Sequence, residues 1–215
     1  PELGLIGPAQ FIQVAEGLQL MVPIGQWVLD EALGQIKAWK AAGWHEPRVA
    51  VNLSSVQFRA ADFVPSVLDA LRRHDLAGKN LELELTERMV MDEDEDTATK
   101  LAALKTAGIG LAIDDFGTGY SSLSHLRTLP IDRLKIDQSF VRELTDSRDC
   151  FAITEATIRL ASSLGMLTIA EGVETEAQRT ILRQLHVNAT QGFLIAHPMG
   201  ANDFMAWLRT ATFKN

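Results

Sequence analysis

Polar side chains end a series of strand-like segments that alternate with helical segments along this chain. The strand-like segments are RVAVN, LELELTE, IGLAIDD, DRLKID, MLTIAE and NAT, and their polar residues recur about 20 to 36 residues apart, at Asn52, Glu84, Asp114, Lys135, Glu171 and Gln191. A strand with its return helix needs roughly 30 residues. Right-handed βα units close into a barrel, and barrel enzymes keep their active sites at the carboxyl ends of the strands. The spacing therefore predicts that these side chains gather at one end of a parallel sheet.

The pattern between these residues predicts the order of the elements without a linker. We expect strands over 48–53, 81–86, 109–114, 132–137, 166–170 and 188–190. Helices are expected over 10–20, 24–42, 62–74, 149–164, 175–186 and 202–211, and another helix begins in the acidic run MDEDED and ends at Gly108. This order is typical of an α/β protein in which at least one barrel strand is missing or irregular.

Composition favours a single domain without a membrane span. The chain has 215 residues, of which 47% are apolar and 22% charged, which are ordinary values for a globular domain. No apolar run has the roughly 18 residues that a membrane span needs, and no signal-peptide pattern begins the chain. Cys150 is the single cysteine. It therefore forms no internal disulfide, favours a reducing compartment, and is expected to be a small, partly buried residue near a helix start.

The charge and the polar residue types together indicate a small anionic ligand and a hard metal ion. The net charge of −8 argues against sequence-independent contact with duplex nucleic acid, but a bound metal reverses the local field and permits a phosphate ligand. Crowded carboxylates repel one another unless a cation lies between them. Amide and carboxylate oxygens favour Mg²⁺ or Mn²⁺, and the five histidines lack the ligand spacing that zinc requires.

Six motifs, in order along nearly the whole chain, resemble the signatures of the EAL domain, the bacterial cyclic-di-GMP phosphodiesterase. They are VNLSSVQF, LELELTERM, AIDDFGTGYSSL, LKIDQSFV, IAEGVET and TQGFLIAHP. The resemblance implies a (β/α)8 TIM-type barrel with one antiparallel strand, formed as a single domain by residues 1–215. It also implies hydrolysis of cyclic di-GMP to linear pGpG with Mg²⁺ or Mn²⁺.

The namesake Glu-Ala-Leu motif of that family belongs to its first strand, which would lie upstream of Pro1. A literal Glu31-Ala32-Leu33 occurs within the amphipathic segment WVLDEALGQIKAW. We interpret it as a coincidence, because a motif outside its structural context is only a hypothesis. Two explanations stay open: the first strand is truncated from this sequence, or the protein lacks one metal ligand.

The resemblance assigns metal ligands residue by residue. Asn52, Glu84 and Asp114 would hold a first ion together with the upstream glutamate, and Asp115 would hold a second ion. Two adjacent ions can clamp the attacking and leaving oxygens of an in-line phosphodiester displacement.

The resemblance also assigns the catalytic residues. Glu171 matches the general base, and Lys135 would orient the attacking water or offset phosphate charge. The matched residues that line or support the site are Asp137, Glu174 and Gln191.

A glycine loop beside the site would link it to a dimer. Glu87 matches the residue that anchors the loop Phe116–Gly119, and the following Tyr120-Ser121-Ser122 would run toward a helix of a homodimer. Expected partners are cyclic di-GMP, a second copy and flanking sensory or cyclase domains of a longer multidomain protein. We expect this domain to be cytoplasmic and to make no membrane contact itself, although the full-length protein could be anchored to the inner membrane.

Two other functions remain as alternatives. A catalytically inactive EAL domain would serve as a cyclic-di-GMP receptor, and a metal-dependent barrel hydrolase could act on another phosphodiester. Phe193 and His197 stand where the family has tyrosine and lysine, which could alter the contacts with a base or the affinity.

Each residue taken alone also has an ordinary structural explanation. Asn52 could cap a turn, Lys135 could be a surface charge, and either Glu82 or Glu84 could belong to a solvated face, because they alternate along LELELTE. Asp114-Asp115 before a glycine loop is common in turns, and Glu171 could simply end a strand. For the tryptophans, core packing is expected at Trp27, Trp39, Trp44 and Trp207.

Overall fold

The computed structural model describes residues 6–91, 95–119 and 123–211. The chain divides into two compact units. Unit 1 comprises Pro1–Asp114 and Gly119–Asp132, and unit 2 comprises Asp115–Thr118 and Arg133–Asn215. The expectation of a single domain over 1–215 stays a prediction.

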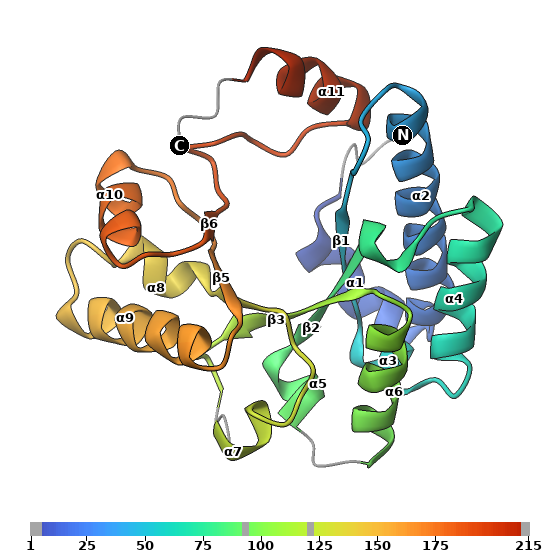
Figure 1. The fold of residues 1–215 in the computed structure, drawn as a ribbon, viewed down its shortest axis with the longest axis horizontal. Coiled ribbons are helices and arrows are strands. Elements are labelled where there is room, and N and C mark those ends of the chain that lie inside the picture. Colours follow the sequence, from blue (N-terminus) through green and yellow to red (C-terminus); the bar gives the residue numbers. More distant parts are fainter. Residues whose placement is uncertain (1–5, 92–94, 120–122, 212–215) are drawn as a thin grey trace. The chain divides into compact units, whose positions relative to one another are not determined.

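Unit 1 is built from parallel strands that alternate with helices (Figure 1). Its strands pair in chain order, with Asn52 opposite Glu84 and Thr86 opposite Asp114. Its elements are α1 (Pro8–Gly17), α2 (Met21–Ala41), β1 (Val49–Asn52), α3 (Ser55–Arg59), α4 (Phe63–His74), the 3-10 turn η1 (Gly78–Asn80), β2 (Leu81–Thr86), α5 (Glu87–Met91), α6 (Glu95–Thr106), the first part of β3 (Gly110–Phe116) and α7 (Leu123–Leu126).

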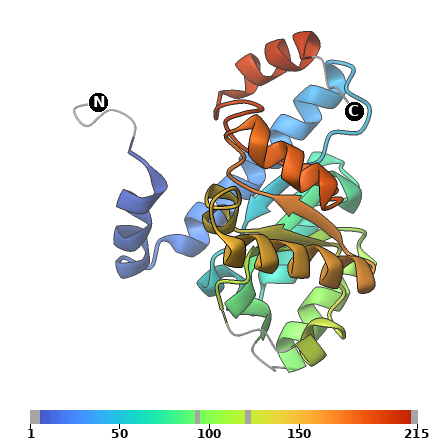
Figure 2. The ribbon, with the colours of Figure 1, turned by 90° about the vertical axis from the view of Figure 1, so that its left-hand side faces the viewer.

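Unit 2 repeats the same pattern. Its strands also run parallel in chain order, and α9 packs along β4 and β5 (Figure 2). Its helices and strands are β4 (Arg133–Ile136), α8 (Gln138–Arg142), α9 (Arg148–Ser163), β5 (Leu167–Ala170), α10 (Glu176–Gln184), β6 (Ala189–Thr190) and α11 (Ala201–Thr210).

Each unit has its own apolar core. In unit 1, the buried positions of α2 are Leu29, Leu33 and Ile36, which recur at the helical period and form the stripe that packs against neighbouring elements. In unit 2, a cluster joins β4, β5 and the helices that follow them, and its buried members are Ile136, Val141, Leu144, Ile158, Ala170, Val173 and Leu182. Burial of such a side chain contributes roughly 1.5–3 kcal/mol, so the ends of β4 and β5 are held firmly.

Local capping fixes where the helices of unit 2 begin. Thr175 and Gln178 form a reciprocal capping box at the start of α10, and Ser147 accepts a hydrogen bond from the Cys150 backbone at the start of α9. Such caps satisfy backbone N–H groups that have no partner within the helix. They also set the length of the connections that follow β4 and β5. Cys150 is partly buried two residues into α9, as expected.

The structure agrees with most of the expected elements and corrects some details. β2 spans the residues expected, whereas α1 begins earlier, with Pro8 at its first position, a place that proline favours. The expectation for Trp27 is wrong, because 63% of its surface is exposed. Trp27 lies two residues before buried Leu29, about 200° around the helix and therefore on the opposite face.

Two further expectations concern strand direction and the membrane. The pairings described within each unit are all parallel, so the antiparallel strand is not confirmed. Among the described residues, no helix is long and apolar enough to cross a membrane.

Candidate active site

The register of the strands in unit 1 brings three expected ligands together. Asn52 ends β1 and is the pairing partner of Glu84 on β2, while Asp114 lies two residues beyond the partner of Glu84 on β3. Side chains two residues apart along a strand share one face of the sheet. One atom of the Asn52 side-chain amide therefore lies 3.2 Å from Glu84 Oε2 and 3.1 Å from Asp114 Oδ2.

The chemistry of this oxygen cluster fits a hard cation. In one orientation of the Asn52 amide, its oxygen faces only acceptors. Three converging oxygens without a hydrogen between them repel one another, and a divalent cation that takes oxygen ligands relieves that repulsion. Glu84 is 7% exposed, whereas Asn52 is exposed to solvent. The cluster thus combines a buried carboxylate with an opening to solvent.

A second group of expected residues meets at the ends of β4 and β5 in unit 2. Lys135 pairs with Ile169, and Glu171 lies two residues beyond Ile169, so both charged side chains are expected on the same face. Lys135 Nζ lies 2.6 Å from Glu171 Oε1. The Glu171 backbone N–H also donates to the Ile136 carbonyl over 3.1 Å, which continues the ladder past the end of β5. The exposed fraction of Lys135 is 3%, so its interpretation as a surface charge is wrong.

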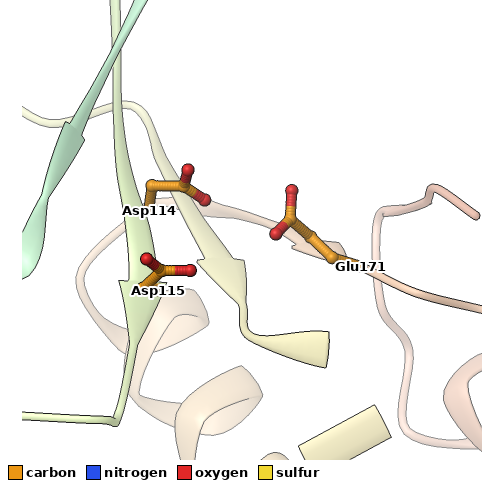
Figure 3. A group of neighbouring side chains, drawn as sticks. All are labelled: Asp114, Asp115 and Glu171. Atoms are coloured by element: carbon orange, nitrogen blue, oxygen red, sulfur yellow. The ribbon is translucent and has the colours of Figure 1, made fainter. Parts of the chain in front are cut away.

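Asp115 brings a carboxylate toward Glu171. A carboxylate oxygen of each residue lies within 4.8 Å of one on the other, and Figure 3 shows the two groups pointing toward each other. The backbone of Asp115 is left-handed, with φ 54°. Non-glycine residues rarely adopt this conformation, and such strain is concentrated at functional sites.

Asp137 has a structural role that the motif did not reveal. It is the N-cap of α8 and accepts hydrogen bonds from the backbone and hydroxyl of Ser139. Burial raises the pKa of the Asp137 carboxyl, but the hydrogen bonds from Ser139 and one with Asp115 outweigh burial, so that the pKa lies below its ordinary value of 3.8. Ser139 is therefore a supporting residue that was missed. The signal that could have found it is the cap pattern Asp-x-Ser after a strand.

Gln191 and Glu174 lie in the segments that follow β6 and β5. The Gln191 backbone N–H donates to the Ala170 carbonyl over 2.8 Å, and its carbonyl accepts from the Val173 N–H over 3.0 Å. Glu174 is exposed, and its backbone N–H donates to Gln178 Oε1. The backbone of Gln191 is thus fixed one strand away from Glu171, whereas the Glu174 side chain is not held by any described hydrogen bond.

The buried carboxylate of Glu87 lies against the glycine loop. Glu87 is 5% exposed, and a Cβ placed on Gly119 would lie 2.9 Å from its Oε1. A side chain at residue 119 would therefore require the Glu87 carboxylate to shift. The expected continuation of the loop, Tyr120-Ser121-Ser122, lies outside the described residues.

Phe193 and His197, which depart from the family pattern, stack on each other. Their ring centroids are 4.4 Å apart and their planes are inclined by 29°. Phe193 is 53% exposed, so the pair forms an aromatic surface beyond β6 rather than part of the core.

Parallel βα units whose strand ends carry carboxylates, an amide and a lysine define an α/β protein of the TIM-barrel type with an acidic, metal-compatible site. The EAL domain family matches residues 1–198. The chain belongs to this family.

Comparison with curated proteins supports this membership. Over 206 residues the chain is 46% identical to the bifunctional diguanylate cyclase/cyclic di-GMP phosphodiesterase MucR of Pseudomonas aeruginosa, covering 96% of this chain and 30% of that protein. It is 38% identical over 209 residues to a cyclic di-GMP phosphodiesterase of the same organism, covering 97% of this chain and 35% of that protein. The chain therefore spans about a third of the length of these relatives.

A solved structure extends the likeness to the fold. The chain is similar to the phosphodiesterase PaMucR in complex with c-di-GMP, with a TM-score of 0.92 and 46% identity over 95% of this chain and 83% of that chain. This likeness confirms the expected α/β fold class with its barrel-like architecture.

Proposed function

We propose that this chain is a metal-dependent phosphodiesterase domain that hydrolyses cyclic di-GMP to linear pGpG. The observation that carries the proposal is the convergence of the Asn52 side-chain amide with the carboxylates of Glu84 and Asp114 in unit 1. Two relatives are named as cyclic di-GMP phosphodiesterases, and a similar structure is named as a phosphodiesterase in complex with c-di-GMP. The matched catalytic residues Lys135 and Glu171 also form a close ion pair in unit 2.

Asn52, Glu84 and Asp114 would hold one Mg²⁺ or Mn²⁺ ion, and Asp115 would hold a second. Such ions supply charge stabilisation to the phosphodiester and lower the pKa of an attacking water. Asn52 and Asp115 are each exposed to solvent, so a substrate phosphate could reach the ions that these residues would hold.

Glu171 would act as the general base. Its Oε1 is held by Lys135, and the oriented carboxylate would accept a proton from the attacking water. Lys135 donates three hydrogens and bears a compact positive charge. It therefore fixes the orientation of the Glu171 carboxylate and can offset negative charge that develops on the phosphate.

The remaining assigned residues would support these groups. Asp137 would hold Asp115 through their hydrogen bond, and Gln191 and Glu174 would border the substrate. We further propose that the domain acts as a homodimer within a multidomain signalling protein. Glu87 and the glycine loop would connect the dimer to Asp115.

Formation of pGpG from cyclic di-GMP tests the proposed activity. We expect turnover with Mg²⁺ or Mn²⁺ and none in EDTA, whereas the larger and more loosely coordinated Ca²⁺ should bind without supporting turnover. Full activity with Ca²⁺ would contradict the argument from tight octahedral geometry.

Substitution of the proposed general base distinguishes an active phosphodiesterase from an inactive cyclic-di-GMP receptor. General-base catalysis contributes roughly 10²–10⁴-fold, so Glu171→Gln should lower kcat by that factor and change substrate affinity little. Glu155→Gln, at a half-buried position of α9 that has no assigned role, is the matched control and should retain activity. Binding of cyclic di-GMP by the unsubstituted protein without any pGpG formation would instead support the receptor.

A further inference from the structure

The side-chain amide of Asn52 satisfies its hydrogen-bonding atoms in one of its two orientations, and the other orientation requires a cation between the converging oxygens. With its oxygen turned toward Glu84 and Asp114, three acceptors converge. With the amide turned by 180°, its nitrogen donates to Glu84 Oε2 over 3.2 Å and to Asp114 Oδ2 over 3.1 Å. An amide nitrogen carries two hydrogens. One Asn52 nitrogen can therefore bridge both carboxylates at once.

We propose that Asn52 is an amide latch that turns between these two orientations. In the ion-free protein, its nitrogen faces inward and bridges Glu84 and Asp114. When a divalent ion binds, the amide turns over and presents its oxygen as a ligand. The inference rests on the metal site of the proposed function, but it does not depend on hydrolysis.

The surroundings of Asn52 permit the rotation. Asn52 is at the end of β1 and exposed, so its side chain can turn without moving the core. The torsion that turns a terminal amide is broad and roughly two-fold, unlike the three-fold torsions of an alkyl chain. The carboxylates by contrast are on β2 and β3, and Glu84 is almost fully buried. The amide is thus the mobile part of the cluster.

The latch explains why an amide rather than a third carboxylate suits this position. An aspartate would have no hydrogen to donate and would add a third like charge to the ion-free site. Asparagine keeps the two carboxylates bridged without an ion, although an arriving ion must then displace two hydrogen bonds. The residue therefore lowers the affinity for the ion while it preserves the ion-free site.

Hydrogen exchange of the Asn52 side-chain amide tests the latch directly. In ¹⁵N-labelled protein, the Asn52 signals can be assigned by their absence in Asn52→Asp. We expect the amide hydrogens to exchange slowly with water in EDTA and about tenfold or more faster in Mg²⁺, the factor that corresponds to about 1.4 kcal/mol of lost hydrogen bonding. Exchange that is equally fast in EDTA and in Mg²⁺ would overturn the latch. Faster exchange in Mg²⁺ without pGpG formation would support the latch and contradict the proposed enzyme.

Thermal unfolding of Asn52→Asp provides a second, independent test. The variant should melt below the wild type in EDTA, by about 2–4 °C for each hydrogen bond lost, and Mg²⁺ should raise its Tm by more than that of the wild type. Asn202→Asp, on the exposed start of α11, adds the same charge at a helix N-terminus, so its Tm in EDTA should equal or slightly exceed that of the wild type, and Mg²⁺ should not change the difference. An Asn52→Asp protein whose Tm in EDTA equals that of the wild type would overturn the proposal. A variant that folds only with Mg²⁺ would support it.

Discussion

Removal of the Lys135 charge should destabilise unit 2 through the buried ion pair with Glu171. Their charged atoms are 2.6 Å apart, and their side chains are 4% and 17% exposed. At an effective dielectric constant of about 20, two unit charges at this distance attract by about 6 kcal/mol. Desolvation of the nearly buried ammonium offsets much of that attraction. We therefore expect a net coupling of about 2 kcal/mol, near the value for hydrogen bonds to charged groups.

A double-mutant cycle measures this coupling. Lys135→Met, Glu171→Gln and the double variant are unfolded with urea in EDTA, and the coupling is the part of the free-energy change that the single variants do not explain. Lys135→Met alone should cost about 3 kcal/mol, because it leaves the carboxylate without its cation in a mostly buried position. Methionine keeps much of the length and volume of lysine. The cycle therefore reports chiefly the charge.

A second ion pair in the same unit provides the control. Arg159 and Glu155 are 2.7 Å apart on α9, but their side chains are 77% and 35% exposed. Exposed pairs one helical turn apart contribute only about 0.3–0.5 kcal/mol. The cycle for Arg159→Met and Glu155→Gln should therefore give a much smaller coupling. Equal couplings for the two pairs, or less than about 0.5 kcal/mol for Lys135 and Glu171, would refute the argument from burial.

Three further substitutions test other parts of the site. Gly192→Ala should lower the free energy of unfolding in urea by about 1–3 kcal/mol, since φ of Gly192 is 155° and the new Cβ would lie 2.3 Å from the Val173 backbone nitrogen and oxygen. The control is Gly17→Ala, whose Cβ would have no atom within 4 Å. Equal losses for the two variants would contradict the argument from close approach. Ser139→Ala should lower the free energy of unfolding above pH 3.8. The difference from wild type should vanish as the pH falls below that value, because the Asp137 carboxyl, whose pKa is lowered, stabilises the fold only while it is ionised. A difference that persists in acid would point to another cause. Glu87→Ala should weaken Mg²⁺ binding and turnover together while the circular dichroism spectrum is unchanged, and an unaltered Mg²⁺ titration would show that the loop is not coupled to the site.

Much of the fold follows from periodicity, because the longer strands and helices carry enough residues to show their period. The strand with alternating Leu81, Leu83 and Leu85 is one example. The helices α3, α5 and α8 were not predicted, since each has only five residues, which is little more than one helical turn. Side-chain caps from Ser54 and Asp137 begin α3 and α8 instead, and α5 directly follows β2.

The site was less accessible to sequence reasoning than the fold. Alternation in LELELTE suggested that one face of the strand could be solvated, yet Glu82 and Glu84 are 4% and 7% exposed. Glu82 Oε2 lies 3.5 Å from Arg48, which directly precedes β1, and periodicity cannot predict this contact. The pairing of Lys135 with Glu171 likewise depends on the register of β4 and β5. Register is a property of the assembled sheet, and a single residue's neighbours in sequence do not determine it.

The left-handed backbone of Asp115 lowers the stability of the fold at a residue whose carboxylate has a proposed role in metal binding. A left-handed conformation costs an ordinary residue roughly 1–2 kcal/mol; asparagine and aspartate tolerate it better, and glycine adopts it without that cost. Selection for heat resistance alone would therefore favour Asp115→Gly, which relaxes the backbone and removes a carboxylate that faces Glu171. If Asp115 holds a metal ion as proposed, a laboratory evolution experiment that selects only for survival at high temperature would enrich Asp115→Gly variants that fold but do not hydrolyse the substrate. Such a change would give an EAL domain a direct route from enzyme to binding protein.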